Sequence, residues 1–156
     1  MVYFVGAGTG AVDLITVRGM CLLEQADVII YAGSLVNPQL LDYAKKDCEC
    51  HNSAKMTLDE VIDVMCKAEQ EQKMTVRLHT GEPSVYGAVR EQMDELEKHG
   101  IAYESCPGVS ACFGAASSLN LEFTLPNVSQ SLIITRMADL MNLVLSILTV
   151  IIITSE

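Results

Sequence analysis

The chain has 156 residues, half of them apolar, and a formal net charge of −10. That length suits one domain with a substantial core, since about 100 to 200 residues per domain is usual. Acidic residues outnumber basic ones twofold, whereas a nucleic-acid interface needs clustered lysine and arginine, so we expect no nucleic-acid partner. Six cysteines are scattered with no signal peptide before them, which predicts a reducing, cytoplasmic compartment.

The first third of the chain predicts two strands joined by a helix. An apolar run, residues 2–5, opens into the glycine-rich loop Gly6 to Gly10. A helix is expected from Thr16 to Ala26, followed by a buried strand from Asp27 to Tyr31. After a loop over residues 32–37, Pro38 suits the first turn of a short helix that reaches Ala44.

The middle of the chain predicts two more helices around a central strand. Cys48 to His51 is a weak candidate for a brief strand. Thr57 and Glu60 form a capping box, and a helix follows whose apolar stripe is Leu58, Val61, Ile62, Met65 and Ala68. A strand from Met74 to Leu78 then runs into a loop over residues 80–87. Ser84 is the expected N-cap of the next helix, which has an inward face of Val89, Met93 and Leu96 and ends before Gly100.

The last third predicts a strand from Ala102 to Cys106, a turn at Pro107 to Ala111 and a small-residue helix from Ala111 to Leu119. A fifth strand is expected at Leu132 to Thr135. Residues 140–154 form an almost unbroken apolar segment, shorter than the roughly 20 residues that cross a bilayer. A buried helix or strand, a membrane anchor and a damaged chain end all remain open for it, with a membrane role the least favoured.

Strands that alternate with helices predict an α/β fold, a Rossmann-like domain with a mostly parallel five-stranded sheet and flanking helices. Small-residue loops follow successive strands at Gly6 to Gly10, Ala32 to Ser34, Thr80 to Gly87 and Pro107 to Ala111. The carboxyl ends of parallel strands share one edge, so these loops should converge on one crevice. We expect it to take one long, shallow ligand.

Other readings of these motifs are weaker. Gly6 to Ala11 satisfies the loose dinucleotide fingerprint, but the second strand ends in Tyr31-Ala32-Gly33 where a ribose-binding acid is needed, which disfavours a nicotinamide-dependent oxidoreductase. No Gly-Lys-Ser/Thr follows the glycines, so a P-loop is excluded. Cys48-Glu49-Cys50-His51 has no matching second pair, and we expect no metal site.

Several stretches carry a resemblance to a known family. They are Val5-Gly6-Ala7-Gly8-Thr9-Gly10, Ala26-Asp27-Val28-Ile29-Ile30-Tyr31-Ala32-Gly33-Ser34-Leu35-Val36, His79-Thr80-Gly81-Glu82-Pro83-Ser84-Val85-Tyr86-Gly87, Pro107-Gly108-Val109-Ser110-Ala111, and Leu125-Pro126 with Thr135-Arg136. Together they resemble the tetrapyrrole (corrin and porphyrin) methyltransferases from about Val2 to Met137. Within that family they are most similar to the members that methylate ring carbon C11 in cobalamin biosynthesis.

The resemblance implies a two-domain enzyme that binds S-adenosylmethionine between its domains, releases S-adenosylhomocysteine and works as a homodimer on a tetrapyrrole. The cofactor-binding positions that it implies are Thr80, Gly81, Glu82, Val85, Ser110 and Ala111. The substrate-binding positions that it implies are Gly8, Thr9, Gly10 and Ser34.

Methyl transfer to a ring carbon depends chiefly on alignment and exclusion of water. We therefore expect His79 to be a packed hydrogen-bond partner and not a catalytic base. The carboxylates of a tetrapyrrole would favour Arg18, Arg90 or Arg136 nearby.

The chain also departs from the family pattern. Thr9 and Ala11 stand where proline and aspartate are common, and Glu82 stands where aspartate is usual. Family members continue into a second domain, whereas the similarity here decays after Met137. We therefore expect residues 1–136 to form the methylase domain and 137–156 an apolar tail in place of the start of the C-terminal domain, with little activity from this chain alone. A non-catalytic module that dimerises or binds tetrapyrrole, and a methyltransferase for another ring carbon, remain alternatives. The sequence leaves open whether the substrate carries cobalt.

Overall fold

The computed structural model describes residues 1–128 and 130–134. The chain divides into two compact units, Met1–Ala111 and Cys112–Glu156, and each is described by itself. The apolar segment at 140–154 and the predicted boundary between residues 136 and 137 lie outside the described residues, so both stay predictions.

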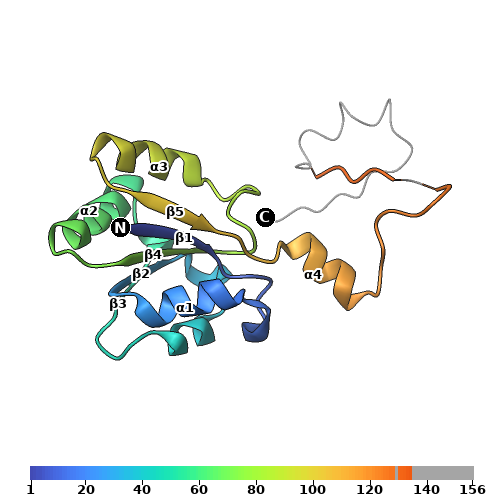
Figure 1. Ribbon diagram of the computed structural model, residues 1–156, viewed down its shortest axis with the longest axis horizontal. Coiled ribbons are helices and arrows are strands. Elements are labelled where there is room, and N and C mark those ends of the chain that lie inside the picture. Colours follow the sequence, from blue (N-terminus) through green and yellow to red (C-terminus); the bar gives the residue numbers. More distant parts are fainter. Residues whose placement is uncertain (129, 135–156) are drawn as a thin grey trace. The chain divides into compact units, whose positions relative to one another are not determined.

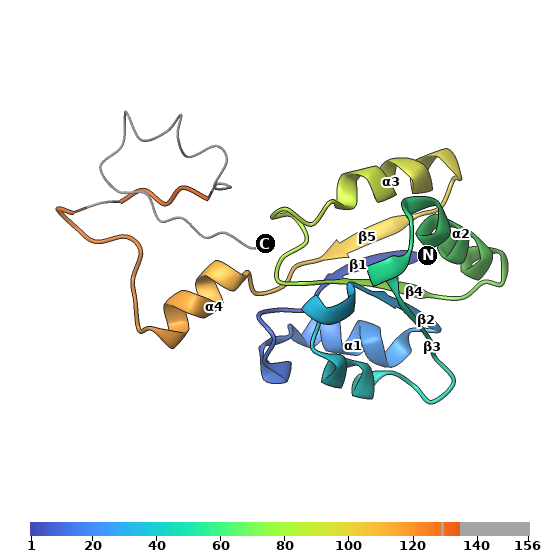
Figure 2. The same ribbon diagram turned by 180° about the vertical axis from the view of Figure 1, so that it is seen from behind.

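The first unit contains a five-stranded sheet in which every pairing is parallel, in the order β3-β2-β4-β1-β5. Figure 2 shows this order from β5 at the top to β3 at the bottom. The strands are β1 (Val2–Gly6), β2 (Val28–Tyr31), β3 (Glu49–Asn52), β4 (Thr75–His79) and β5 (Tyr103–Cys106). The predicted α/β fold class is confirmed.

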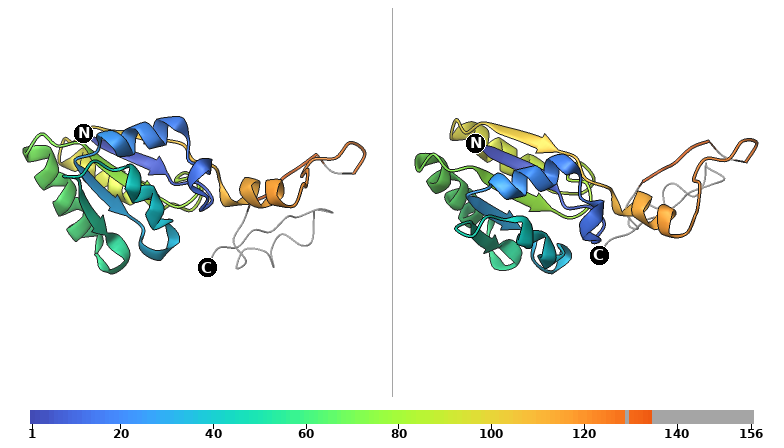
Figure 3. Two further views of the ribbon diagram at one scale, coloured as in Figure 1. Left: turned by 90° about the horizontal axis from the view of Figure 1, so that it is seen from below. Right: turned by 60° about the horizontal axis from the view of Figure 1, so that its bottom comes forward.

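Helices cover both faces of the sheet. The α-helices of this unit are α1 (Val17–Gln25), α2 (Leu58–Gln70) and α3 (Val89–Lys98). Short 3-10 helices are η1 (Val12–Leu14), η2 (Gly33–Leu35), η3 (Pro38–Tyr43) and η4 (Ser53–Lys55). Figure 3 (left) shows α1, in blue, and α2, in green, on opposite sides of the strands.

The two faces of the sheet carry separate apolar cores, because side chains alternate along each strand. On one face, Phe4 and Ile30 pack with Met65 of α2 and Leu96 of α3. On the other face, the core includes the buried apolar residues Val5, Leu23, Ile29, Leu40, Val76 and Leu78. Since β4 and β1 lie in the middle, both faces of these strands are buried, which explains their continuous apolar sequences.

Most local predictions are confirmed. Thr16 caps α1 by accepting a hydrogen bond from the Gly19 N–H at 3.1 Å, and η3 begins with Pro38 in its first turn. Thr57 and Glu60 form the predicted capping box of α2. In the stripe behind it all members are buried except Leu58, which is 38% exposed.

The predicted start of α3 is wrong. The helix begins at Val89, and its N-cap is Ala88 in a left-handed conformation, with φ 49°. Ser84 instead lies in a tight turn that folds the chain back on itself, so that a Cβ on Gly87 would meet the Pro83 carbonyl oxygen at 2.1 Å. Residues 84–87 form this turn, so they cannot also form the first turn of α3.

The predicted strand at 132–135 is wrong over its described part, because residues 132–134 are not in a strand. Thr135 lies outside the described residues. The fifth strand of the sheet is the weak candidate at Cys48 to His51, observed as Glu49–Asn52. Edge position explains the weak signal, since three of these four residues are exposed and an edge strand needs no continuous apolar sequence.

The predicted small-residue helix is α4 (Ala111–Ser118). Within the second unit, the rings of Phe113 and Phe123 lie 6.2 Å apart, centroid to centroid.

Candidate functional site

The loops after β1, β4 and β5 meet at the carboxyl edge of the sheet, on the right in Figure 1. Three glycines from these loops touch through their backbones. A Cβ on Gly6 would lie 2.5 Å from the nitrogen of Gly108 and 2.5 Å from the carbonyl oxygen of Gly81. A Cβ on Gly108 would lie 2.1 Å from the same oxygen. No other residue fits at Gly6 or Gly108 without moving the backbone.

The loops after β1 and β4 are also joined by hydrogen bonds. Gly8 and Gly81 form an isolated antiparallel bridge, in which the Gly81 N–H donates to the Gly8 carbonyl at 2.9 Å and the Gly8 N–H donates back at 3.3 Å. The Ala7 N–H donates to the His79 carbonyl at 2.6 Å. The convergence predicted from the small-residue loops is therefore present for these strands.

Glu82 ties the loop after β4 to the loop after β5. Its Oε2 accepts a hydrogen bond from the Gly108 N–H at 2.8 Å, and its Oε1 accepts one from the Ser84 N–H at 3.0 Å. Burial raises the pKa of the Glu82 carboxyl, but the backbone donors of Ser84 and Gly108, together with the Ser84 side chain, outweigh it, and the pKa lies below its ordinary value. Sequence reasoning missed this link, because no local pattern connects Glu82 with Gly108.

Five of the six predicted cofactor-binding positions lie at this junction, and Val85 lies in the turn that follows Glu82. A Cβ on Gly81, whose φ is 57°, would lie 3.5 Å from the Ala111 nitrogen and 3.9 Å from the Ser110 Cα. Thr80 is exposed next to Gly81. Val85 is half-buried and closes a turn by donating its N–H to the Glu82 carbonyl at 3.1 Å. The structure thus brings residues 80–82 and 110–111 together.

The predicted substrate-binding positions are divided between two loops. Gly8 is buried in the bridge, whereas Thr9 and Gly10 are half-buried, and nothing lies within 4 Å of a Cβ placed on Gly10. The Asn37 side chain donates to the Gly10 carbonyl at 2.7 Å, which joins this loop to the segment after β2. The backbone of Ser34 lies in η2 of that segment.

A buried polar group lies behind the junction, on β4 and α3. Arg77 donates to the Gln92 side-chain oxygen at 3.0 Å and to the Ile30 carbonyl at 3.2 Å. Gln92 in turn donates to the Ala88 carbonyl at 3.2 Å, which fixes the start of α3. Burial lowers the pKa of Arg77 to about 10, so it stays charged at neutral pH. The role of Gln92 was not predicted.

His79 is a neutral, packed side chain. It is 5% exposed, its ring centroid lies 6.1 Å from that of Phe4, and burial together with the charge of Arg77 lowers its pKa to about 3. The predicted packing is confirmed. The predicted hydrogen bond is absent at Nε2, which has no partner among the described residues.

The three arginines expected near substrate carboxylates have different positions. Arg18 is exposed on α1. Arg90 is engaged by Asp94 and Glu97 of its own helix, which raises its pKa and leaves it poorly placed for a ligand. Arg136 lies outside the described residues.

All six cysteines are free thiols, and burial followed by the neighbouring Cys50 raises the pKa of Cys48 to about 12. Within the described part of the chain no cluster of three or more metal-ligating side chains occurs. Two hollows of about 180 and 90 Å³ lie at the amino ends of the strands, away from the glycine junction. Among the residues that the structure describes, every helix is too short or too polar to span a bilayer.

The fold and this junction define an α/β protein in which backbone groups line much of the carboxyl edge of the sheet, where ligands bind in proteins of this class. Residues 1–155 match the family model described as Tetrapyrrole (Corrin/Porphyrin) Methylases, and the chain belongs to this family. The resemblance inferred from the sequence motifs is therefore confirmed.

Relatives with curated names lie close in sequence. The chain is 60% identical over 135 residues to the cobalt-precorrin-4 C(11)-methyltransferase of Methanocaldococcus jannaschii, a match that covers 86% of this chain and 52% of that protein. It is 50% identical over 137 residues to the precorrin-4 C(11)-methyltransferase of a Sinorhizobium species, covering 88% and 54% respectively. The chain thus spans about half the length of the curated relatives it matches.

Solved structures agree with the fold. The X-ray structure of a cobalamin biosynthetic enzyme, cobalt precorrin-4 methyltransferase, matches with a TM-score of 0.85 and 45% identity over 86% of this chain and 56% of that one. The uroporphyrin-III C-methyltransferase of Thermus thermophilus, crystallised with S-adenosylhomocysteine, matches with a TM-score of 0.71 and 28% identity over 86% of this chain and 54% of that one.

Proposed function

We propose that this chain supplies the S-adenosylmethionine-binding half of a methyltransferase that acts on ring carbon C11 of precorrin-4 or cobalt-precorrin-4. The observation that carries the proposal is the glycine junction, where Gly81 lies against residues 110 and 111 and leaves backbone groups to face a ligand. The high identity to relatives with that name supports the substrate and the ring position.

The residues at the junction fit S-adenosylmethionine. Thr80 and Ala111 are exposed residues, and Gly81 has no side chain to fill the space beside residues 110 and 111. We assign the cofactor to Thr80, Gly81, Glu82, Val85, Ser110 and Ala111. When bound, the cofactor supplies a methyl group on a sulfonium that is already a good leaving group.

The contribution left to the protein is to align the substrate with the methyl group of the cofactor. A ring carbon of the conjugated macrocycle is the nucleophile, and holding it in line with the methyl group can replace acid–base catalysis, with effective molarities of about 10⁵ to 10⁸ M in favourable cases. His79 suits this reading because its pKa of about 3 makes it a very weak base. Its role is to pack under the loop that follows β4.

The tetrapyrrole is assigned to Gly8, Thr9, Gly10 and Ser34. Space beside Gly10 leaves room for a ligand there. Arg77 is buried and Arg90 is ion-paired, so Arg18, exposed on α1, is the described arginine that remains to meet a substrate carboxylate. We also propose a homodimer in the cytoplasm, as the family resemblance implies. The free state of all six cysteines supports a reducing compartment.

The test begins with binding. Calorimetric titration with S-adenosylhomocysteine would use a chimera in which residues 1–136 replace the matching half of the Methanocaldococcus jannaschii relative, beside the 156-residue chain alone. We expect the chimera to bind and to transfer labelled methyl to C11 of cobalt-precorrin-4. A chimera that folds but binds no S-adenosylhomocysteine contradicts the proposal. Binding without turnover would favour a non-catalytic module.

A matched pair of glycine variants locates the cofactor. Gly81 and Gly100 have similar positive φ values, 57° and 66°, so replacing either by alanine introduces similar backbone strain. Only Gly81→Ala adds a methyl group beside residues 110 and 111. We expect at least about a tenfold loss of affinity in Gly81→Ala and little change in Gly100→Ala, because the added methyl group would make ordinary contacts with residues 110 and 111 but would take up space that we assign to the cofactor. Equal effects would contradict the assignment.

A further inference from the structure

Both carboxylate oxygens of Glu82, which is half-buried, accept hydrogen bonds from backbone groups. One carboxylate oxygen accepts from the Gly108 N–H at 2.8 Å and the other from the Ser84 N–H at 3.0 Å. Each hydrogen bond has a charged acceptor and a backbone donor, which makes it stronger than a neutral pair. A side chain held in this way has both carboxylate oxygens directed to backbone donors of the protein.

The same contact fixes two loops that are distant in the sequence. Gly108 crosses so close to Gly81 that any Cβ would collide with the Gly81 carbonyl oxygen, and Glu82 is the next residue after Gly81. The carboxylate therefore holds the Gly108 backbone against the Gly81 backbone from the side. Ser110 and Ala111 lie two and three residues after Gly108, so their distance from Gly81 depends on this bond.

We propose that Glu82 is a positioning residue, whose carboxylate joins the loops after β4 and β5 and sets the gap between Gly81 and residues 110–111. The inference rests on the proposed function, because that gap is where we assign the cofactor. The family resemblance implies that Glu82 binds the cofactor without saying which atoms do so. We assign ligand binding to the Glu82 backbone and the link between the loops to its side chain.

A glutamine cannot reproduce this arrangement. Its amide has one oxygen acceptor, and its nitrogen is a donor, so one of the two backbone N–H groups would face another donor. An aspartate keeps the charge with a shorter reach. Burial disfavours the carboxylate, yet the two N–H donors and the Ser84 side chain outweigh this and hold its pKa low, so the acceptor is present in its charged form at neutral pH.

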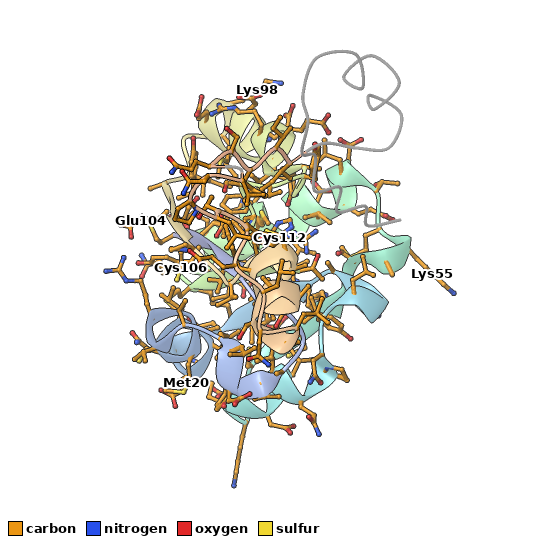
Figure 4. All side chains as sticks on the ribbon, turned by 90° about the vertical axis from the view of Figure 1, so that its right-hand side faces the viewer. Met20, Lys55, Lys98, Glu104, Cys106 and Cys112 are labelled. Carbon is orange, nitrogen blue, oxygen red and sulfur yellow. The ribbon has the colours of Figure 1, made fainter. Side chains whose placement is uncertain are left out.

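The experiment compares Glu82→Gln, Glu82→Asp and the control Glu104→Gln in the chimera described above. Glu104 lies on β5 and points outward at the left of Figure 4. The first measurement is amide hydrogen exchange at Gly108 and Ser84, which needs no ligand. We expect Glu82→Gln to lose about tenfold or more of the protection at one or both amides, Glu82→Asp to keep part of it, and Glu104→Gln to match the unmodified protein.

The second measurement is S-adenosylhomocysteine affinity, with the urea midpoint recorded alongside. We expect Glu82→Gln to lose at least about tenfold in affinity, with partial rescue in Glu82→Asp and a much smaller change in global stability. Unchanged exchange at both amides would overturn the inference, as would lost protection with unchanged affinity. If the unmodified protein binds no S-adenosylhomocysteine, the proposed function fails, while the exchange data still decide whether the link between the loops exists.

Discussion

His79 should make the stability of the chain depend on pH between about pH 7.5 and pH 5. In the folded protein, burial and the charge of Arg77 lower its pKa from 6.5 to about 3. In the unfolded chain the imidazole regains its ordinary pKa, so the unfolded state binds more protons throughout this range. Stability is therefore fully present above pH 6.5 and falls as the solution becomes more acidic.

The size of the effect follows from the pKa difference. Each pH unit below 6.5 removes about 1.4 kcal/mol while the folded histidine stays neutral. At about pH 5 the loss is about 2 kcal/mol, a large part of the 5 to 15 kcal/mol that is typical for a domain. Most carboxylates titrate below this range, and variants at different histidines separate the contribution of His79 from those of His51 and His99.

Urea unfolding at several pH values measures this directly. We expect the free energy of unfolding to fall by about 2 kcal/mol from pH 7.5 to pH 5 in the unmodified chain, and to lose most of that slope in His79→Gln. The control His99→Gln, at an exposed histidine after α3, should keep the slope. An unmodified chain no more sensitive to pH than His79→Gln would refute the reasoning, as would an NMR titration in which the imidazole gains a proton near pH 6.

Three further changes test other contacts. Gly108→Ala forces a methyl group to 2.1 Å from the Gly81 carbonyl oxygen, so we expect a loss of about 1–3 kcal/mol by urea unfolding and loss of S-adenosylhomocysteine binding in the chimera; wild-type values for both would be incompatible with the contact. Thr57→Ala removes the capping box of α2 and should cost about 1 kcal/mol in the same assay, whereas no change would mean that the cap is unimportant. Asp27→Asn removes the charge of a partly exposed carboxylate that accepts from Lys45 at 2.5 Å and from the Met74 N–H at 2.7 Å, and we expect a loss of at most about 1 kcal/mol that shrinks in high salt; a salt-independent loss would point to the Met74 hydrogen bond instead of the ion pair.

Much of the fold could be predicted from local patterns. The strands at the centre of the sheet are continuous apolar runs because both faces are covered, and α2 is recognisable from Thr57, Glu60 and its apolar stripe. The start of α3 was predicted at Ser84 and is at Val89, because the turn that brings Gly87 against Pro83 depends on geometry that residue types only suggest. The apolar pattern of β3 is weak because the strand lies at the edge of the sheet, where three of its four residues are exposed.

The amino-acid sequence by itself determined the alternation of strands and helices, the family and the loops that carry the candidate site, because each depends on residues that are neighbours in the chain. Only the tertiary structure decided that Gly6, Gly81 and Gly108 touch, that Glu82 binds the Gly108 amide and that Gln92 supports Arg77. These contacts join loops and helices from separate parts of the chain, and their backbone and side-chain geometry exists only after the sheet has assembled.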